Sequence, residues 1–241
     1  MGRGYPHRFG GVIAAMLDRV FTAEERSFDQ LEHVAIAITQ LRGHPTQHHI
    51  GVMHKDMSTG KVSMLHLAWH HDLKDSDPKA SYAWVVPSIP RPRARQVAAF
   101  CRKVKKANPS GVPYAFSHAS DCLNIQTGAY VGGPGHYGLT CATFVLAIFD
   151  ATGLPLVQYG TWPASRDGDD EWRSCVIESL KNSGATPDHI ARVESEMTTV
   201  RYRPVDVAGA AASSSIPACY DEANKIAAQI MSKVKRNNCI T

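Results

Sequence analysis

The sequence predicts an α+β fold in which a small antiparallel β-sheet, or a partial barrel, packs against one strongly apolar helix. Short β-rich runs dominate residues 33–86, and helical spacing of apolar residues dominates the chain after residue 91. A chain of 241 residues with 44% hydrophobic and 20% charged residues is typical of a globular protein with a substantial core. We therefore expect residues 1–241 to form a single domain.

The predicted elements begin with a helical extension over residues 1–30. Apolar residues recur there around Ala15, Met16 and Val20, between Phe9 and Gln30. Runs rich in β-branched and aromatic residues then predict four strands. These runs are His33–Leu41, His49–His54, Lys61–Trp69 and Ser81–Val86.

The second and third runs are predicted to form a hairpin, because turn-forming residues lie between them at 56–60. With the turn centred there, facing residue numbers sum to about 117, which places His66 opposite Gly51. His66 then lies on the same face as His49, diagonal to it and roughly 5–8 Å away, whereas a slip of one residue would separate them. Because Gly51 has no side chain, we expect the helix that carries Cys141 to approach this face.

Residues Arg91–Lys106 are predicted to form a basic amphipathic helix, in a stretch without acidic residues between positions 78 and 120. Apolar residues keep helical spacing at Val97, Phe100, Cys101 and Val104. The pattern favours a solvated outer face, and the alternative is a surface for an acidic partner such as nucleic acid, anionic lipid or an acidic protein. Nucleic acid is the least favoured partner, because interleaved aromatic residues and a known binding motif are both missing from the sequence.

The apolar segment that follows is predicted to be a helix that begins at Cys141, with Thr140 as N-cap and Gly153 at its end. In the first turn, unpaired backbone N–H groups and the helix dipole favour a thiolate and can bind an oxyanion. Cys141 also lies on an apolar stripe, so a buried core cysteine is the alternative interpretation. The stripe continues through Phe144, Val145, Ile148 and Phe149.

The C-terminal part of the chain is predicted to be helical. A cap followed by a first-turn proline opens a helix at Thr186, which places His189 on a helix and argues against a site whose cysteine precedes its histidine. Residues 208–241 are expected to be an Ala/Ser-rich linker, Ala208–Ser215, and an amphipathic helix, Asp221–Lys235. That helix would pack on the core or on a partner.

Cys141, His49 and His66 together form a candidate catalytic constellation. A cysteine nucleophile requires an imidazole within hydrogen-bond reach, and that imidazole requires a second polar group that fixes its tautomer. Seven of the twelve histidines lie between residues 44 and 71, so two histidines on one face also arise by chance. His33, at the start of the first run, is the alternative base, and His49 is favoured because its hairpin also supplies His66.

The segment His49-Ile50-Gly51-Val52, with Leu65-His66-Leu67 after the turn, resembles the first hairpin of the circularly permuted NlpC-like, papain-fold hydrolases, a group that includes the lecithin:retinol acyltransferase-like enzymes. Thr140–Val145 resembles the cysteine motif of that group, and the resemblance spans roughly His33 to Leu156. It implies a permuted papain-like domain in which Cys141 is the nucleophile, His49 the general base and acid, and His66 the orienting group. Tyr114 would line the substrate site or donate to an oxyanion, although a packed core tyrosine is the favoured interpretation of this residue. Thr140 would contact substrate.

The resemblance further implies a cysteine-dependent hydrolase that cleaves an amide through an acyl-enzyme, without a cofactor or a metal. The amide would belong to a peptide or protein substrate, as a peptide bond, an isopeptide bond or a cell-wall crosslink. A thiol acyltransferase or a lipid-ester hydrolase of the same fold is the nearest alternative. The alternative from another class is a non-enzymatic binding module that uses the basic helix and the C-terminal helix.

Two rival motifs have weaker support. Residues 133–138 match the glycine pattern of a dinucleotide-binding turn, but no acidic residue follows at the position that would bind the ribose. A turn that delivers Cys141 explains these glycines better. A metal site built from His48, His54, His70, His71 and Asp72 lacks the helical spacing of known zinc motifs.

The cysteines and the hydropathy bear on the compartment. The six cysteines are scattered without a C-x-x-C pair, which favours a thiol-reducing compartment over a disulfide scaffold. The sequence shows no secretory signal and no run close to the ~18 apolar residues of a membrane span. We therefore expect a cytoplasmic protein, or one exported by a leaderless route.

Overall fold

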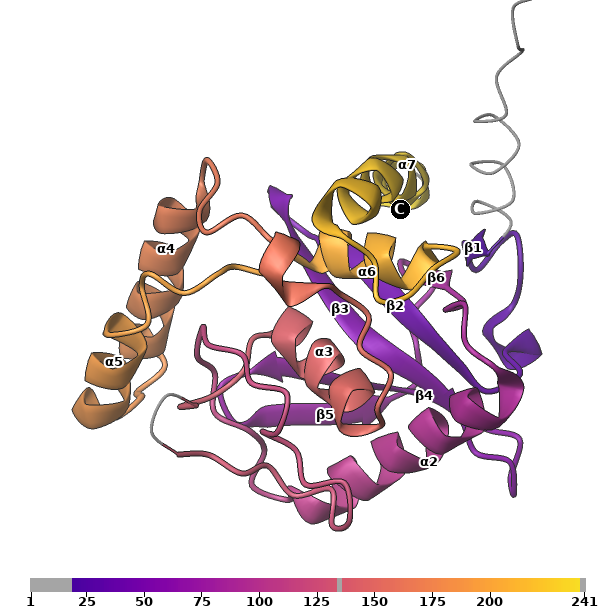
Figure 1. The fold of residues 1–241 in the computed structure, drawn as a ribbon, viewed down its shortest axis with the longest axis horizontal. Helices are drawn as coiled ribbons and strands as arrows, with labels where there is room; N and C mark the ends of the chain where they lie inside the picture. The colour runs from indigo at the N-terminus through magenta and orange to yellow at the C-terminus, as the bar shows by residue number, and fades with distance from the viewer. Residues whose placement is uncertain (1–18, 134–135, 239–241) are drawn as a thin grey trace, which may run out of the picture.

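The computed structural model describes residues 19–133 and 136–238, and its centre is a six-stranded antiparallel sheet in the order β1-β6-β2-β3-β4-β5 (Figure 1). The predicted α+β class and antiparallel sheet are confirmed. The strands are β1 (Val20–Phe21), β2 (Val34–Leu41), β3 (His44–Lys55), β4 (Val62–Trp69), β5 (Asp72–Ser76) and β6 (Ala83–Val85). The α-helices are α2 (Arg91–Ala107), α3 (Cys141–Ala151), α4 (Asp169–Asn182), α5 (Pro187–Glu194), α6 (Pro204–Ala212) and α7 (Tyr220–Asn238).

The β3–β4 hairpin has the predicted register. Val52 faces Leu65 and Lys55 faces Val62, so facing residue numbers sum to 117. The turn between them closes when the backbone N–H of Gly60 donates to Asp56 O at 2.8 Å. This register places His66 opposite Gly51, as the turn-forming residues predict.

The two faces of the sheet bury different groups of side chains. The face that carries Ile50 and Leu65 packs against the helices and belongs to the large core. The other face carries a smaller apolar cluster around Trp84. Because side chains alternate along a strand, His49 and His66 lie on the Trp84 face.

The helices cover the large-core face and one end of the molecule (Figure 1). Helix α2 packs on β3, and α3 packs on both β3 and β4. Helices α6 and α7 pack on each other and on β2. Helices α4 and α5 form a pair that stands away from the sheet, on the left of Figure 1.

The prediction for the N-terminal extension is wrong for its described part. Residues 19–30 are not an α-helix, because Val20–Phe21 forms an edge strand paired with Trp84 and Val85 of β6. Val20 is fully buried there, so tertiary packing overrides a weak helical pattern. A short 3-10 helix follows at Phe28–Gln30, and the rest of the extension, residues 1–18, lies outside the described residues.

The predicted linker Ala208–Ser215 is also wrong in its first half. Residues 204–212 form α6, and Val207–Ala212 are buried in it. Its alanines leave little side-chain bulk, which lets α6 pack closely on α7. The predicted C-terminal helix itself is confirmed as α7.

Candidate functional site

A cavity of about 320 Å³ at the start of α3 brings four of the predicted site residues together. Cys141, His49, Tyr114 and Thr140 all line it, and His66 lies behind His49 outside the lining. The other lining residues are Leu41, His44, Gln47, His48, Ala68, Trp69, Ala142, Trp172, Cys175, Val176, Ser179, Arg201, Tyr202 and Pro204. We call this space the Cys141 cavity.

The start of α3 is fixed by a capping box. The Thr140 side chain accepts from the backbone N–H of Thr143 at 3.1 Å, and the Thr143 hydroxyl accepts from the backbone N–H of Thr140 at 2.8 Å. These bonds satisfy two donors at the helix start, so the predicted N-cap is confirmed. The Thr140 hydroxyl is therefore engaged in the cap, although Thr140 also lines the cavity.

The loop before α3 is held against residues 113–115. The backbone N–H of Leu139 donates to Pro113 O at 2.9 Å. A Cβ atom added to Gly138 would lie 2.5 Å from Pro113 O, so only glycine permits this approach. The contact brings Tyr114 beside Cys141, where the Cys141 backbone N–H faces the Tyr114 hydroxyl. The glycine-rich turn upstream of Gly138 lies partly outside the described residues, at 134–135.

Tyr114 is clamped from three sides. Its ring packs on Trp69, with centroids 4.7 Å apart. Its backbone N–H donates to His70 Nδ1 at 3.1 Å, and its carbonyl accepts from His189 Nε2 at 2.9 Å. Burial lowers the pKa of His70 to about 4, with the nearby His189 adding to the effect. His189 lies in a helix, α5, as predicted, but no sequence pattern indicates that it and His70 hold Tyr114.

The predicted histidine pair is present. His49 Nε2 and His66 Nδ1 are 2.7 Å apart, and one of these nitrogens donates to the other. Burial lowers the pKa of His49 to about 3, and the neighbouring His66 and Lys74 add to the effect. Burial likewise lowers the pKa of His66 to about 4. Both imidazoles are therefore neutral at neutral pH.

The expectation that α3 approaches the Gly51 face is wrong. A Cβ atom on Gly51 would lie 2.8 Å from His66 Cβ, so His66 fills the space that we assigned to the helix. Helix α3 packs instead on the large-core face, and the backbone N–H of Ile50 faces Cys141. Among the described residues, no hydrogen bond joins Cys141 to His49 or His66.

The charge state expected for Cys141 also needs correction. Burial raises the pKa of the thiol to about 11, although the backbone N–H groups of Ile50 and Ala142 and the charge of Arg201 act in the opposite direction. The helix start favours the thiolate, but desolvation opposes it and is the larger effect at a residue only 7% exposed. The resting group is a thiol, and it needs a base before it can attack.

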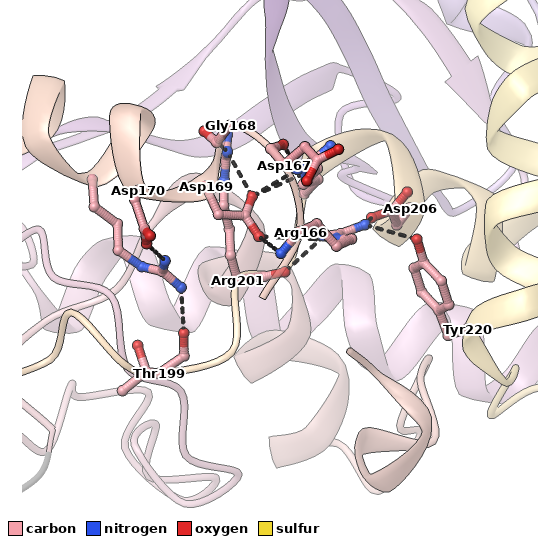
Figure 2. A network of polar contacts seen from close by, with 11 residues as sticks. Arg166, Asp167, Gly168, Asp169, Asp170, Thr199, Arg201, Asp206 and Tyr220 are labelled. Carbon is pink, nitrogen blue, oxygen red and sulfur yellow. Dashed lines mark hydrogen bonds and ion pairs between the residues drawn. The ribbon is translucent and has the colours of Figure 1, made fainter. Parts of the chain in front are cut away.

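Arg201 is a cavity residue that the sequence argument missed. It follows α5 in the chain, and no local motif marks it. Its Nη1 donates to Asp169 Oδ1 at 2.9 Å, and its guanidinium lies 3.9 Å from the centre of the Trp172 ring. Figure 2 shows Arg201 within a network that links the start of α4 to α6 and α7.

The alternative base and the basic helix lie elsewhere. His33 Nε2 accepts from Arg91 Nε at 3.1 Å, and His33 does not line the Cys141 cavity. Four cations of α2 donate to backbone carbonyls of neighbouring segments, which gives them a structural role. They are Arg93, Arg102, Lys103 and Lys105.

The histidines of the rival metal site have other partners. His54 contacts Asp75 at 2.9 Å, and His71 contacts Ser110 O at 3.1 Å. Within residues 19–133 and 136–238, no three His, Cys, Asp or Glu side chains form a group that could hold a metal ion.

Three comparisons with known proteins bear on the family of this chain. A scan against models of protein families, a search of curated proteins and a search of solved structures each found no match. In the part of the chain that the structure describes, no helix has both the length and the apolar character needed to cross a membrane. The family resemblance of the hairpin and the cysteine segment therefore stays a prediction from those residues.

Proposed function

We propose that this protein is a cysteine-dependent hydrolase with Cys141 as its nucleophile and an amide as its substrate. The observation that carries the proposal is the Cys141 cavity, which Cys141 at the start of α3 shares with His49 of the His49–His66 pair. The resemblance to the permuted papain-fold hydrolases points to the same three residues.

The proposed mechanism starts from neutral groups. His49 donates its Nε2 proton to His66 Nδ1, which leaves His49 Nδ1 as an acceptor. The mechanism then requires an imidazole that takes the proton from the Cys141 thiol as the sulfur attacks the substrate carbonyl. The resemblance assigns this role to His49, whose side chain lies on the sheet face opposite to α3. His66 holds the tautomer and does not exchange protons with the substrate.

The oxyanion and the leaving group complete the cycle. The backbone N–H of Cys141 and the hydroxyl of Tyr114 lie together and can donate to the oxyanion. His49 then protonates the leaving amine, and a thioester forms between Cys141 and the acyl group. Water attacks the thioester with His49 as base, which releases the acid and restores the thiol. Another nucleophile in place of water would make the same site an acyltransferase.

Labelling of the cysteines tests the nucleophile. Cys175 is exposed and lines the same cavity, so we place all measurements in a Cys175→Ser background. With iodoacetamide at pH 8, Cys141 should react at least about tenfold faster than Cys101 and Cys122, which are also buried and whose pKa values burial also raises. Peptide mass spectrometry over time measures the three rates. Equal rates in the folded protein would mean that Cys141 is an ordinary core cysteine.

Two histidine variants test the base. His49→Ala should slow the labelling of Cys141, because the thiol loses its proton acceptor, while His33→Ala should leave the rate near that of the parent. His33 is the matched control because it directly precedes strand β2 and bonds Arg91 outside the cavity. A larger effect at His33 would move the site to β2.

A further inference from the structure

Arg201 gives the Cys141 cavity its charge. Among the described residues that line this cavity, Arg201 carries the only permanent charge, and no Asp or Glu lines it. Burial lowers the pKa of Arg201 to about 10, which still leaves it positive at neutral pH. A negatively charged ligand is therefore favoured in the cavity, and a cation is disfavoured.

The position of the Arg201 guanidinium is fixed by its neighbours. Asp169, 1% exposed, accepts from Arg201 Nη1 at 2.9 Å and also from Arg203 at 2.8 and 3.1 Å. The face of the guanidinium lies on Trp172. The carboxylate of Asp169, labelled beside Arg201 in Figure 2, and the ring of Trp172 together restrict the position of the guanidinium.

One edge of Arg201 remains available. Its Nη1 donates to Asp169 and to Gly168 O, whereas its Nη2 makes no hydrogen bond within the described part of the chain. Arg201 and Arg203 share the Asp169 carboxylate, and its single negative charge does not neutralise both guanidinium groups. The next cation, Arg166, already binds Asp206 at 2.5 Å.

We propose that Arg201 binds a carboxylate of the substrate, so that the enzyme selects acyl groups with a carboxylate near the scissile carbonyl. This inference rests on the proposed function. Suitable substrates are peptides or amides with an Asp or Glu side chain, or a free terminal carboxylate, beside the cleaved bond. A carboxylate fits better than a phosphate, because one free Nη2 edge matches one small anion and the neighbouring cations are already paired.

Two alkylating agents of nearly equal size test this without a known substrate. Iodoacetate and iodoacetamide both form an S–C bond to the thiolate and release iodide, and they differ in carrying a carboxylate or an amide. In the Cys175→Ser background, the ratio of the two rates at Cys141 should exceed the ratio for the urea-unfolded chain by about tenfold. Added salt should lower this preference.

Two arginine variants assign the effect. Arg201→Gln should reduce the rate ratio to that of the unfolded chain, and Arg201→Lys should retain part of it because the charge remains. Arg203→Gln is the matched control, since Arg203 binds the same Asp169 but does not line the Cys141 cavity, and it should keep the parental ratio.

The outcomes separate the two proposals. An unchanged ratio in Arg201→Gln, or an equal loss in Arg203→Gln, overturns the role of Arg201 while rapid labelling by iodoacetamide leaves the nucleophile in place. A Cys141 that neither reagent labels overturns both. If Arg201→Gln does not fold, Arg201→Lys is compared with Arg203→Gln. A rate ratio in Arg201→Lys that equals the parental ratio at every salt concentration overturns the proposal.

Discussion

At the residue scale, two opposing effects act on the Cys141 thiol. The backbone N–H groups at the helix start and the charge of Arg201 favour the thiolate, and burial favours the thiol more strongly, so the pKa is raised to about 11. The lowered pKa of His49, about 3, means that it does not carry the positive charge of an imidazolium partner at neutral pH. The resting pair is therefore neutral, and proton transfer has to accompany attack.

This charge state predicts how alkylation depends on pH. Below the thiol pKa the thiolate fraction grows about tenfold per pH unit, so the iodoacetamide rate at Cys141 should rise about tenfold per unit between pH 7 and pH 10. Measurement in the Cys175→Ser background gives the profile directly. A rate that stays level from pH 5 to pH 9 would instead indicate that an imidazole takes part, either in a preformed thiolate–imidazolium pair or as a general base, and would contradict attack by the free thiolate.

The role of His66 gives a second residue-scale prediction. His66→Ala should lower the rate at which Cys141 is acylated by p-nitrophenyl acetate, because His49 loses the acceptor that fixes its tautomer. His66→Asn should retain more activity, since its amide oxygen can accept the same proton. The loss should be smaller than for Cys141→Ala.

Thermal midpoints on the same samples give the control for these variants. His66 also packs against Gly51, so its removal can lower stability without touching the chemistry. If the rate per folded molecule is equal in all His66 variants, His66 has no part in the site.

At the element scale, the sequence succeeded where local chemistry determines the structure. The β3–β4 register follows from the turn at 56–60, and the start of α3 follows from Thr140. It failed where burial by distant segments decides. Helix α6 resembles a linker because alanine and serine carry no amphipathic pattern, and edge strand β5 is too polar to predict.

The cap of α3 gives the prediction at this scale. Thr140→Ala should destabilise the protein by about 1–2 kcal/mol, because the buried backbone N–H of Thr143 loses its acceptor. Thr140→Ser should recover most of this stability. Urea unfolding monitored by tryptophan fluorescence measures both values. A Thr140→Ala variant as stable as the parent would show that the capping box contributes nothing to the fold.

At the scale of the whole molecule, the candidate site is assembled from four distant segments. Cys141 comes from α3, His49 from β3, Tyr114 from the loop after α2, and Arg201 from the irregular segment between α5 and α6. The first three were predicted because helix starts, hairpins and aromatic residues carry local signals. Arg201 has no such signal, since its position depends on Asp169 and Trp172 of α4.

The buried histidines also make the whole fold sensitive to acid. In the unfolded chain a histidine takes up its proton near pH 6.5, whereas His49, His66 and His70 do so only near pH 3–4 in the folded protein. Between these values the unfolded state binds more protons, so stability is highest above about pH 6.5 and falls as the pH falls.

The last prediction uses His70, which is outside the proposed chemistry. The urea midpoint of the parent should fall steadily between pH 7 and pH 5. In His70→Asn the fall should be shallower, because the variant lacks one imidazole that takes up a proton in the unfolded chain but not in the folded protein. Asparagine can still accept from the Tyr114 backbone N–H, so the clamp on Tyr114 is kept. His71→Asn is the matched control, because His71 is exposed and asparagine tolerates its left-handed φ of 57°. An equal pH dependence in the parent and in His70→Asn would show that burial of this imidazole does not oppose its protonation.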